Sequence, residues 1–224
     1  MKVTALLPMK GHSERVPNKN MRDFAGAPLY HAVLKTLLES KYIAMVVIDT
    51  DSDVIKKDAI THFGDRIQVV DRPVEIQGDF VSMNDIIAYD LQHIDSEHFL
   101  QTHSTNPLLT TQTIDKAIED YFHSLDTHDS VFGVTRLQTR LYDKNTKPIN
   151  HNPKELIRTQ DLEPLFEENS NFYIFSKSSF EASGNKRIGL NPKFVEVNKL
   201  EAIDIDEPED FVLAELLHIH KGKV

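Results

Sequence analysis

Two hydrophobic patterns alternate along the first 135 residues of the chain. Short unbroken apolar runs, typical of strands buried on both faces, alternate with segments whose apolar residues recur every three or four positions, as on one face of a helix. The predicted strands cover residues 3–7, 43–49, 67–70, the region around Phe99 and residues 130–135. The predicted helices begin near Pro28, at Ser52 or Asp53, at Ser82, and after the strand around Phe99, where Thr110 or Thr111 is a candidate cap. This order predicts a doubly wound α/β fold, with helices on both faces of a mainly parallel sheet.

The regular alternation stops at residues 136–170, a polar stretch that contains three prolines. A connection of this length is uncommon inside a compact domain, so we expect a flap or a dimerisation excursion there. Strand character returns at residues 171–175 and 194–197, and Pro208 begins a last helix. We therefore expect one domain over residues 1–224, with a small irregular excursion.

The composition is that of a globular protein, with 40% hydrophobic and 27% charged residues in 224. A net charge of −10 argues against general nucleic-acid binding, which needs a basic face. The chain has no cysteine, which excludes disulfides and thiolate metal sites. No apolar run is long enough for a signal peptide or a membrane span. We expect a soluble, cytoplasmic protein that binds neither nucleic acid nor membrane.

The loop after the first predicted strand, residues 7–20, has the features of a phosphate-binding loop. Such a loop needs backbone N–H groups, little side-chain obstruction and nearby positive charge. This one contains Gly11 and the basic residues Lys10, Arg15 and Lys19. It lacks the glycine spacing of the dinucleotide-binding and Walker motifs, so neither of those two loops is indicated.

The same loop resembles the opening signature of the cytidylyltransferases that activate sialic acid and related nonulosonic acids. In that family a strand leads into Pro-x-Arg-Gly-x-Ser-Lys-x-Ile-Pro-x-Lys-Asn. The positions that fit in register are Pro8, Gly11, Ser13, Val16, Pro17, Lys19 and Asn20. Two positions depart from it, since Lys10 replaces an arginine and Glu14 replaces a lysine, although Arg15 follows directly.

This resemblance implies a nucleotide-diphospho-sugar transferase-like fold and an enzyme that joins CTP to an acidic, sialic-acid-like nine-carbon 2-keto sugar. The products would be a CMP-sugar and pyrophosphate. The resemblance assigns Lys19 to catalysis at the triphosphate. The nucleotide-binding residues it implies in this loop are Lys10, Gly11, Ser13, Arg15 and Asn20. The family commonly forms dimers through the excursion, so a homodimer is expected.

Arg72, in an Asp-Arg-Pro segment after the third predicted strand, resembles the family arginine that approaches cytosine. A guanidinium suits that task because its planar fork can meet the O2 and N3 acceptors of the base. The alternative is a surface ion pair with Glu75.

Two further segments resemble sugar-binding parts of the family. Gln101 stands where the family glutamine faces the sugar, although the segment is two residues longer before its proline. Arg158 matches an arginine segment and is expected to hold the sugar carboxylate by two parallel hydrogen bonds. Glu167 stands where some members have a second arginine, and Arg136 and Arg140 are weaker candidates.

Asp204 and Asp206 precede the last predicted helix, two residues apart. In an extended backbone this spacing places both carboxylates on one side, and two such oxygen donors together with substrate phosphates suit Mg²⁺. The family carries Asp-x-Asp here as its metal ligands. Asp206 is also a plausible N-cap of the helix that Pro208 begins.

The densest histidine cluster, His218 and His220, is expected to be structural, because neighbours two apart on a helix do not share a face. Two other functions stay open on the sequence. One is nucleotidyl transfer to another sugar or from another base. The other is a non-catalytic nucleotide-binding protein of the same fold.

Overall fold

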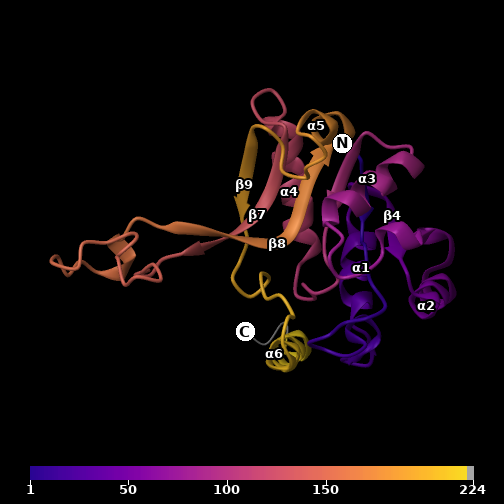
Figure 1. Cartoon of the computed structure of the whole chain (residues 1–224), viewed down its shortest axis with the longest axis horizontal. Coiled ribbons are helices and arrows are strands. Elements are labelled where there is room, and N and C mark those ends of the chain that lie inside the picture. The colour runs from indigo at the N-terminus through magenta and orange to yellow at the C-terminus, as the bar shows by residue number, and fades with distance from the viewer. Residues whose placement is uncertain (221–224) are drawn as a thin grey trace.

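The computed structural model describes residues 1–220 and contains a seven-stranded sheet with helices packed on both faces (Figure 1). The strand order is β5-β4-β1-β6-β8-β7-β9. In chain order the strands are β1 (Val3–Leu6), β4 (Ile43–Thr50), β5 (Ile67–Asp71), β6 (His98–Gln101), β7 (Ser130–Leu137), β8 (Leu165–Ser176) and β9 (Pro192–Glu196). The four neighbouring strands β5, β4, β1 and β6 run parallel to one another, and β7 runs parallel to β9. Strand β8 is antiparallel to both of its neighbours, β6 and β7. The predicted mainly parallel α/β fold is confirmed.

Alternate residues of the strands supply two cores, one on each face of the sheet. Ala5 and Ile48 belong to the core covered by α1 (Tyr30–Glu39), α2 (Asp53–Phe63) and α4 (Thr111–Ser124). Leu6 and Val47 belong to the core covered by α3 (Met83–His93) and α5 (Lys177–Ala182). Because successive side chains of a strand point to opposite faces, unbroken apolar runs are what a sheet covered on both sides requires.

A third, smaller core joins α6 (Pro208–Ile219) to the loop that follows β1. Val16 of this β1 loop (residues 7–20) packs with Ile205 and Phe211, and all three side chains are buried. This packing holds α6 and the residues just before it against the β1 loop, so residues that are distant in sequence meet there. No helix within residues 1–220 combines the length and apolar character needed to span a bilayer.

Side-chain caps begin the helices at the predicted polar residues. Ser52, Ser82 and Thr110 each accept a hydrogen bond from a backbone N–H in the first turn of the helix that follows. The last helix differs from expectation, because its N-cap is Glu207 and not Asp206. Glu207 and Asp210 form a capping box, so the carboxylate of Asp206 is not used at the helix end.

Three parts of the fold were not expected. A short hairpin of β2 (Asp23–Phe24) and β3 (Ala27–Pro28) occupies the region near Pro28, so α1 begins two residues later, at Tyr30. Strand β8 is longer than expected and antiparallel, and α5 follows it directly. Short 3-10 helices cover Lys19–Met21, Gly64–Arg66, Val74–Ile76 and Thr159–Asp161.

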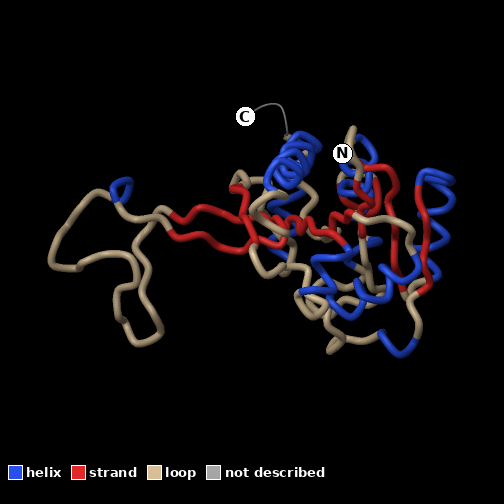
Figure 2. Tube along the Cα trace, turned by 90° about the horizontal axis from the view of Figure 1, so that it is seen from above, coloured by secondary structure: helices blue, strands red, loops and turns tan. Residues whose placement is uncertain are grey.

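The segment between β7 and β8, residues 138–164, projects from the sheet as an arm (Figures 1 and 2). Strands β7 and β8 form a ribbon at its base, with a register shift between Phe132 and Val134. Polar contacts stabilise the arm internally, since Asn150 Nδ2 donates to the carbonyl oxygens of Thr139 and Glu163. Several of its apolar side chains are nevertheless exposed: Tyr142, Ile149, Leu156 and Ile157.

Candidate functional site

The loops that follow β1, β5 and β6 enclose a cavity of about 230 Å³. It lies at the carboxyl ends of these strands, where open parallel sheets bind their ligands. Five residues predicted from the sequence to contact the nucleotide line it together: Lys10, Ser13, Lys19, Asn20 and Arg72. Asp79, His103, Ser104 and Thr105 complete most of its polar wall.

Backbone pairing fixes the start of the β1 loop against β4. The N–H of Leu7 donates to Val47 O and that of Met9 to Asp49 O, both at 2.8 Å. Gly11 then donates its N–H to Asp51 Oδ1 at 2.6 Å. A Cβ atom at Gly11 would lie only 2.9 Å from Cβ of Ser52, so this close approach requires glycine.

Asn20 and Lys10 connect the β1 loop to other walls of the cavity. Asn20 Nδ2 donates to the carbonyl oxygen of Lys10 at 3.0 Å, and its Oδ1 accepts from the hydroxyl of Ser104 at 2.6 Å. The ammonium group of Lys10 forms an ion pair with Asp79, and both side chains are partly exposed. Neutral hydrogen bonds therefore join the β1 loop to the loop after β6, and an exposed ion pair joins it to the loop after β5.

Two cations of the β1 loop reach residues 203–207, which we call the carboxylate segment. Lys19 Nζ donates to Ile205 O at 2.6 Å and lies 4.0 Å from Asp206 Oδ1. Arg15 contacts Asp206 Oδ1 at 2.6 Å and Glu207 Oε1 at 3.2 Å. Burial lowers the pKa of Lys19, although the charges of Asp206 and Asp204 oppose that shift. Positive and negative groups thus meet at one edge of the cavity.

Asp204 has a different environment from Asp206. Its Oδ1 atom is buried and, within the described residues, has no hydrogen-bond partner. Burial raises the pKa of this carboxyl group, an effect opposed by a hydrogen bond from Thr105. The backbone of the carboxylate segment is held by the loop after β6, since Ile205 N donates to Thr105 O at 2.9 Å. A buried oxygen without a donor is a position that a cation can fill.

Arg72 is buried at the floor of the cavity and does not form the alternative surface pair with Glu75. Its Nε donates to Asp49 Oδ1, and one terminal nitrogen lies 3.4 Å from Met9 O. Asp90 of α3 is buried beside Asp49. Burial and the charge of Asp49 raise the pKa of Asp90 to about 9. The guanidinium is therefore fixed in orientation by a buried carboxylate.

The structure adds Arg187 to the site, a residue that the sequence analysis missed. Arg187 NH1 donates to Gln101 Oε1 at 2.7 Å, and its guanidinium stacks on the ring of Tyr173 at 3.6 Å. His103 Nε2 lies 3.4 Å from the same nitrogen. The pKa of the His103 imidazole is lowered mainly by burial and further by the nearby charges of Arg187 and Lys19. The Tyr173 hydroxyl in turn donates to Glu168. Arg187 follows α5 in an irregular segment, where no motif marked it.

Arg158 does not lie with the other predicted site residues. It is on the arm, where its side chain is exposed and pairs with Asp161 at 2.7 Å. Arg140 also binds within the arm, donating to Ile157 O, and Arg136 is exposed on β7. Glu167 is exposed on β8. The site described above therefore contains Gln101 and Arg187 but none of these four residues.

Comparison with known proteins places this geometry among nucleotidyltransferases. A cytidylyltransferase family model matches residues 4–219. N-acylneuraminate cytidylyltransferase A of Danio rerio is 28% identical over 95% of this chain and 50% of its own length. Pseudaminic acid cytidylyltransferase of Campylobacter jejuni is 24% identical over 97% of both chains. The chain thus spans about half the length of the first curated relatives it matches.

A solved structure extends the comparison to the fold. The structure of CMP:2-keto-3-deoxy-manno-octonic acid synthetase complexed with CTP superposes with a TM-score of 0.70 and 11% sequence identity. The superposition covers 99% of this chain and 100% of that chain. At this identity the likeness is one of fold.

Proposed function

The chain belongs to the cytidylyltransferase family, and we propose that it transfers a cytidylyl group from CTP to an acidic, sialic-acid-like nine-carbon 2-keto sugar. The observation that carries this proposal is the cavity itself. Lys10, Lys19 and Arg72 line it beside neutral hydrogen-bonding groups, and the carboxylate segment borders it through Lys19. A triphosphate needs such cations, and a magnesium-assisted transfer needs carboxylates next to them.

We propose that the transfer occurs in one displacement step, without a covalent enzyme intermediate. The anomeric hydroxyl oxygen of the sugar forms a bond to the α-phosphorus of CTP. The bond between that phosphorus and the bridging oxygen breaks, pyrophosphate leaves, and the hydroxyl proton passes to solvent. The contribution of the protein is to align the two reactants and to neutralise developing charge.

Lys19 is the residue we place at the transferring phosphate. Its side chain is held at Ile205 and is only 13% exposed, so its charge is fixed in position before a ligand arrives. Lys10 and Arg15 can exchange their exposed carboxylate partners for phosphate oxygens, because exposed ion pairs contribute little to stability. Ser13 and Asn20 belong to the same loop, whereas the N–H of Gly11 already donates to Asp51 Oδ1.

Asp204 and Asp206 fit a magnesium ion. Asp204 presents a buried carboxylate oxygen that has no donor within residues 1–220, and the carboxylate of Asp206 contacts the exposed side chain of Arg15 and, at 4.0 Å, Lys19. Oxygen donors of this kind are the ones that Mg²⁺ prefers. When bound, Mg²⁺ would neutralise charge on the phosphates. Lys19 and Arg15 would hold the remaining phosphate oxygens.

Arg72 suits the base of CTP. Its Nε and one terminal nitrogen are held by Asp49 and Met9, so the guanidinium keeps one orientation at the cavity floor. The second terminal nitrogen, which makes no hydrogen bond within residues 1–220, can donate its two N–H groups to the O2 and N3 acceptors of cytosine, where uracil would present the N3–H donor. We therefore assign base selection to Arg72.

For the acceptor sugar, Gln101 and Arg187 offer neutral and positive donors close together. Arg187 is partly buried, yet its hydrogen bonds go to the neutral groups Gln101 and His103. A buried guanidinium gains most from a carboxylate that completes its hydrogen bonds. We assign the sugar carboxylate to Arg187.

We also propose that the protein is a homodimer joined through the arm. The exposed apolar residues of the arm support this, because an extended segment gains stability by covering them. Arg158, which lies on the arm, would then act at the site of the second copy and not at its own.

The direct test is pyrophosphate release, measured with Mg²⁺ for each of the four nucleoside triphosphates against eight- and nine-carbon 2-keto sugar acids. We expect turnover with CTP and a nine-carbon acid. Preference for another triphosphate would overturn the cytosine assignment, and preference for an eight-carbon acid would overturn the acceptor assignment. CTP binding without turnover for any pair would favour a non-catalytic nucleotide-binding protein. The same preparation run through size-exclusion chromatography with light scattering tests the dimer.

A further inference from the structure

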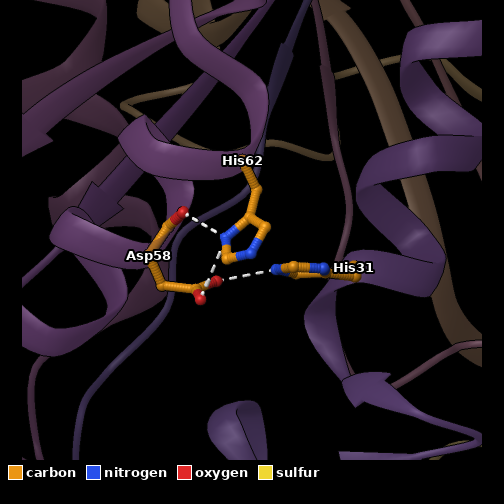
Figure 3. A group of neighbouring side chains, drawn as sticks. All are labelled: His31, Asp58 and His62. Carbon is orange, nitrogen blue, oxygen red and sulfur yellow. Dashed lines mark hydrogen bonds and ion pairs between the residues drawn. The ribbon is translucent and has the colours of Figure 1, made fainter.

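His31 of α1 and Asp58 and His62 of α2 converge outside the cavity (Figure 3). His31 Nε2 lies 2.7 Å from Asp58 Oδ2, and His62 Nδ1 lies 3.2 Å from Asp58 Oδ1. One ligand atom from each residue falls within 4.8 Å of the other two. The cluster has no part in the proposed transfer reaction.

The fold creates this cluster from residues that are separate in the sequence. Asp58 and His62 are four positions apart on α2, so they share one face of the helix. Helices α1 and α2 cover the same face of the sheet, which brings His31 to that pair. Two imidazoles and one carboxylate are a common ligand set for zinc, whereas magnesium prefers oxygen donors alone.

The distances suit a small tetrahedral ion. Ligand atoms bound to zinc at ordinary bond lengths lie about 3.3 Å from one another. His62 Nδ1 and Asp58 Oδ1 lie 3.2 Å apart, close to that value, whereas His31 Nε2 and Asp58 Oδ2 lie at a hydrogen-bond distance of 2.7 Å, so these two side chains must separate by about half an ångström to hold an ion. His62 Nδ1 also donates to the carbonyl oxygen of Asp58 at 2.9 Å, so to bind an ion this nitrogen must pass its proton to Nε2 or solvent and the ring must turn slightly. Its side chain is 54% exposed, which leaves it room to do so.

The rest of the cluster is already rigid. The side chain of His31 is 6% exposed, and its ring packs edge-on against Phe63 at 4.8 Å. The hydroxyl of Tyr30 donates to Asp58 Oδ2, which fixes the carboxylate in the way that outer hydrogen bonds orient metal ligands. Two preformed ligands and one exposed ligand make a site that is accessible from solvent and keeps a position for water.

We propose that His31, Asp58 and His62 bind a divalent transition metal ion of the zinc type, which links α1 to α2. Helix α1 begins after the β1 loop, and α2 begins at the turn where Ser52 contacts Gly11. A metal at this cluster joins α1 to α2, the helix whose N-cap Ser52 lies against Gly11 of the β1 loop. It stabilises the fold there, since a ligand that binds only the folded state shifts the unfolding equilibrium.

The test compares the full chain, freed of metal by a chelator, with two variants. His62→Ala removes the exposed ligand without opening the core, and His93→Ala removes a histidine from the exposed side of α3 as a matched control. Zinc affinity is measured by competition with a chromophoric chelator, and thermal unfolding is followed with and without zinc.

We expect one zinc ion per chain, a higher unfolding midpoint with zinc, and no such shift with magnesium. His62→Ala should weaken zinc binding by about ten-fold or more and lose the shift, while His93→Ala keeps both. Equal zinc affinity in His62→Ala and the unchanged chain would overturn the proposal and leave the cluster as a hydrogen-bond network. Asp58→Asn provides a second ligand variant for the same comparison.

Discussion

Lys19 Nζ donates a hydrogen bond to the backbone oxygen of Ile205 at 2.6 Å, joining the β1 loop to the carboxylate segment 186 positions later. The same ammonium group lies 4.0 Å from Asp206. Val16 and Ile205 pack in one buried cluster beneath this contact. The cations that we propose for the nucleotide and the carboxylates that we propose for the metal therefore belong to a single packed unit, and a change in one is expected to affect the other.

Lys19→Ala is expected to raise the CTP concentration needed for half-maximal rate by about ten-fold or more, because it removes a fixed charge from the triphosphate. Initial rates of pyrophosphate release over a CTP series measure this. Lys41→Ala is the matched control, since Lys41 is an exposed lysine paired with Glu119 away from the cavity. An unchanged CTP requirement in Lys19→Ala would remove this residue from the nucleotide site.

Asp204→Asn is expected to abolish most turnover, with a fall of at least about 100-fold, while the folded protein is as stable as before or more stable. The reason is that the buried Oδ1 of Asp204 has no donor within the described residues, so a neutral amide relieves its desolvation. Pyrophosphate release and thermal unfolding of the same preparation give the two readouts. Asp126→Asn, at an exposed turn, is the control. Near-normal turnover in Asp204→Asn would exclude this carboxylate as a metal ligand.

Gly11→Ala is expected to weaken CTP binding several-fold by pushing the β1 loop away from Ser52, because the added Cβ atom would lie 2.9 Å from that of Ser52. The double variant Gly11→Ala with Ser52→Gly should recover part of the affinity. Glycine is tolerated at an N-cap at a cost of a few tenths of a kcal/mol, about the smallest of any replacement there. Equilibrium CTP binding by the three proteins checks this. A double variant no better than Gly11→Ala would show that steric contact is not the cause.

Much of this arrangement was predictable, because the signals are local. The strands read as apolar runs since both faces of the sheet are covered, and Ser52, Ser82 and Thr110 cap helices through their own side chains. The β1 loop and Arg72 follow parallel strands and Gln101 ends one, so their convergence at one edge of the sheet follows from the fold.

The remaining parts depend on tertiary contacts that the sequence does not encode locally. Strand direction is one example, since the apolar pattern of β8 is the same for parallel and antiparallel pairing. Arg187 is another, because stacking on Tyr173 and bonding to Gln101 place it in the site from an irregular segment. His31 meets Asp58 only because α1 and α2 cover the same face of the sheet.

Arg187→Gln is expected to raise the sugar concentration needed for half-maximal rate by about ten-fold or more and to leave the CTP requirement nearly unchanged. The variant keeps a hydrogen-bonding side chain and removes the positive charge that we assign to the sugar carboxylate. Rates measured at varied sugar with saturating CTP, and at varied CTP with saturating sugar, separate the effect on sugar binding from the effect on CTP binding. Arg187→Lys should recover part of the loss, because it restores the charge without the planar fork. Equal effects on both substrates would indicate a structural role instead.

Asp90→Asn is expected to make the protein less sensitive to alkaline pH. Asp90 is buried beside Asp49, and neither of its oxygens has a donor within the described residues. Its pKa of about 9 is well above the value of about 3.9 for an exposed aspartate, because burial and the charge of Asp49 favour the protonated form. The folded state therefore retains a proton that the unfolded chain loses, so stability falls as pH rises from about 4 towards 9.

An amide at position 90 is neutral throughout this range and can donate to Asp49 in place of the protonated Asp90 carboxyl. The stability of Asp90→Asn relative to the unchanged chain should therefore rise with pH, by at most about 1.4 kcal/mol per pH unit. Urea unfolding at several pH values between 5 and 9 measures the difference. Asp85→Asn, at an exposed position of the same helix, should give a parallel profile. If the stability of Asp90→Asn changes with pH in the same way as that of the unchanged chain, Asp90 does not hold the proton that couples folding to pH.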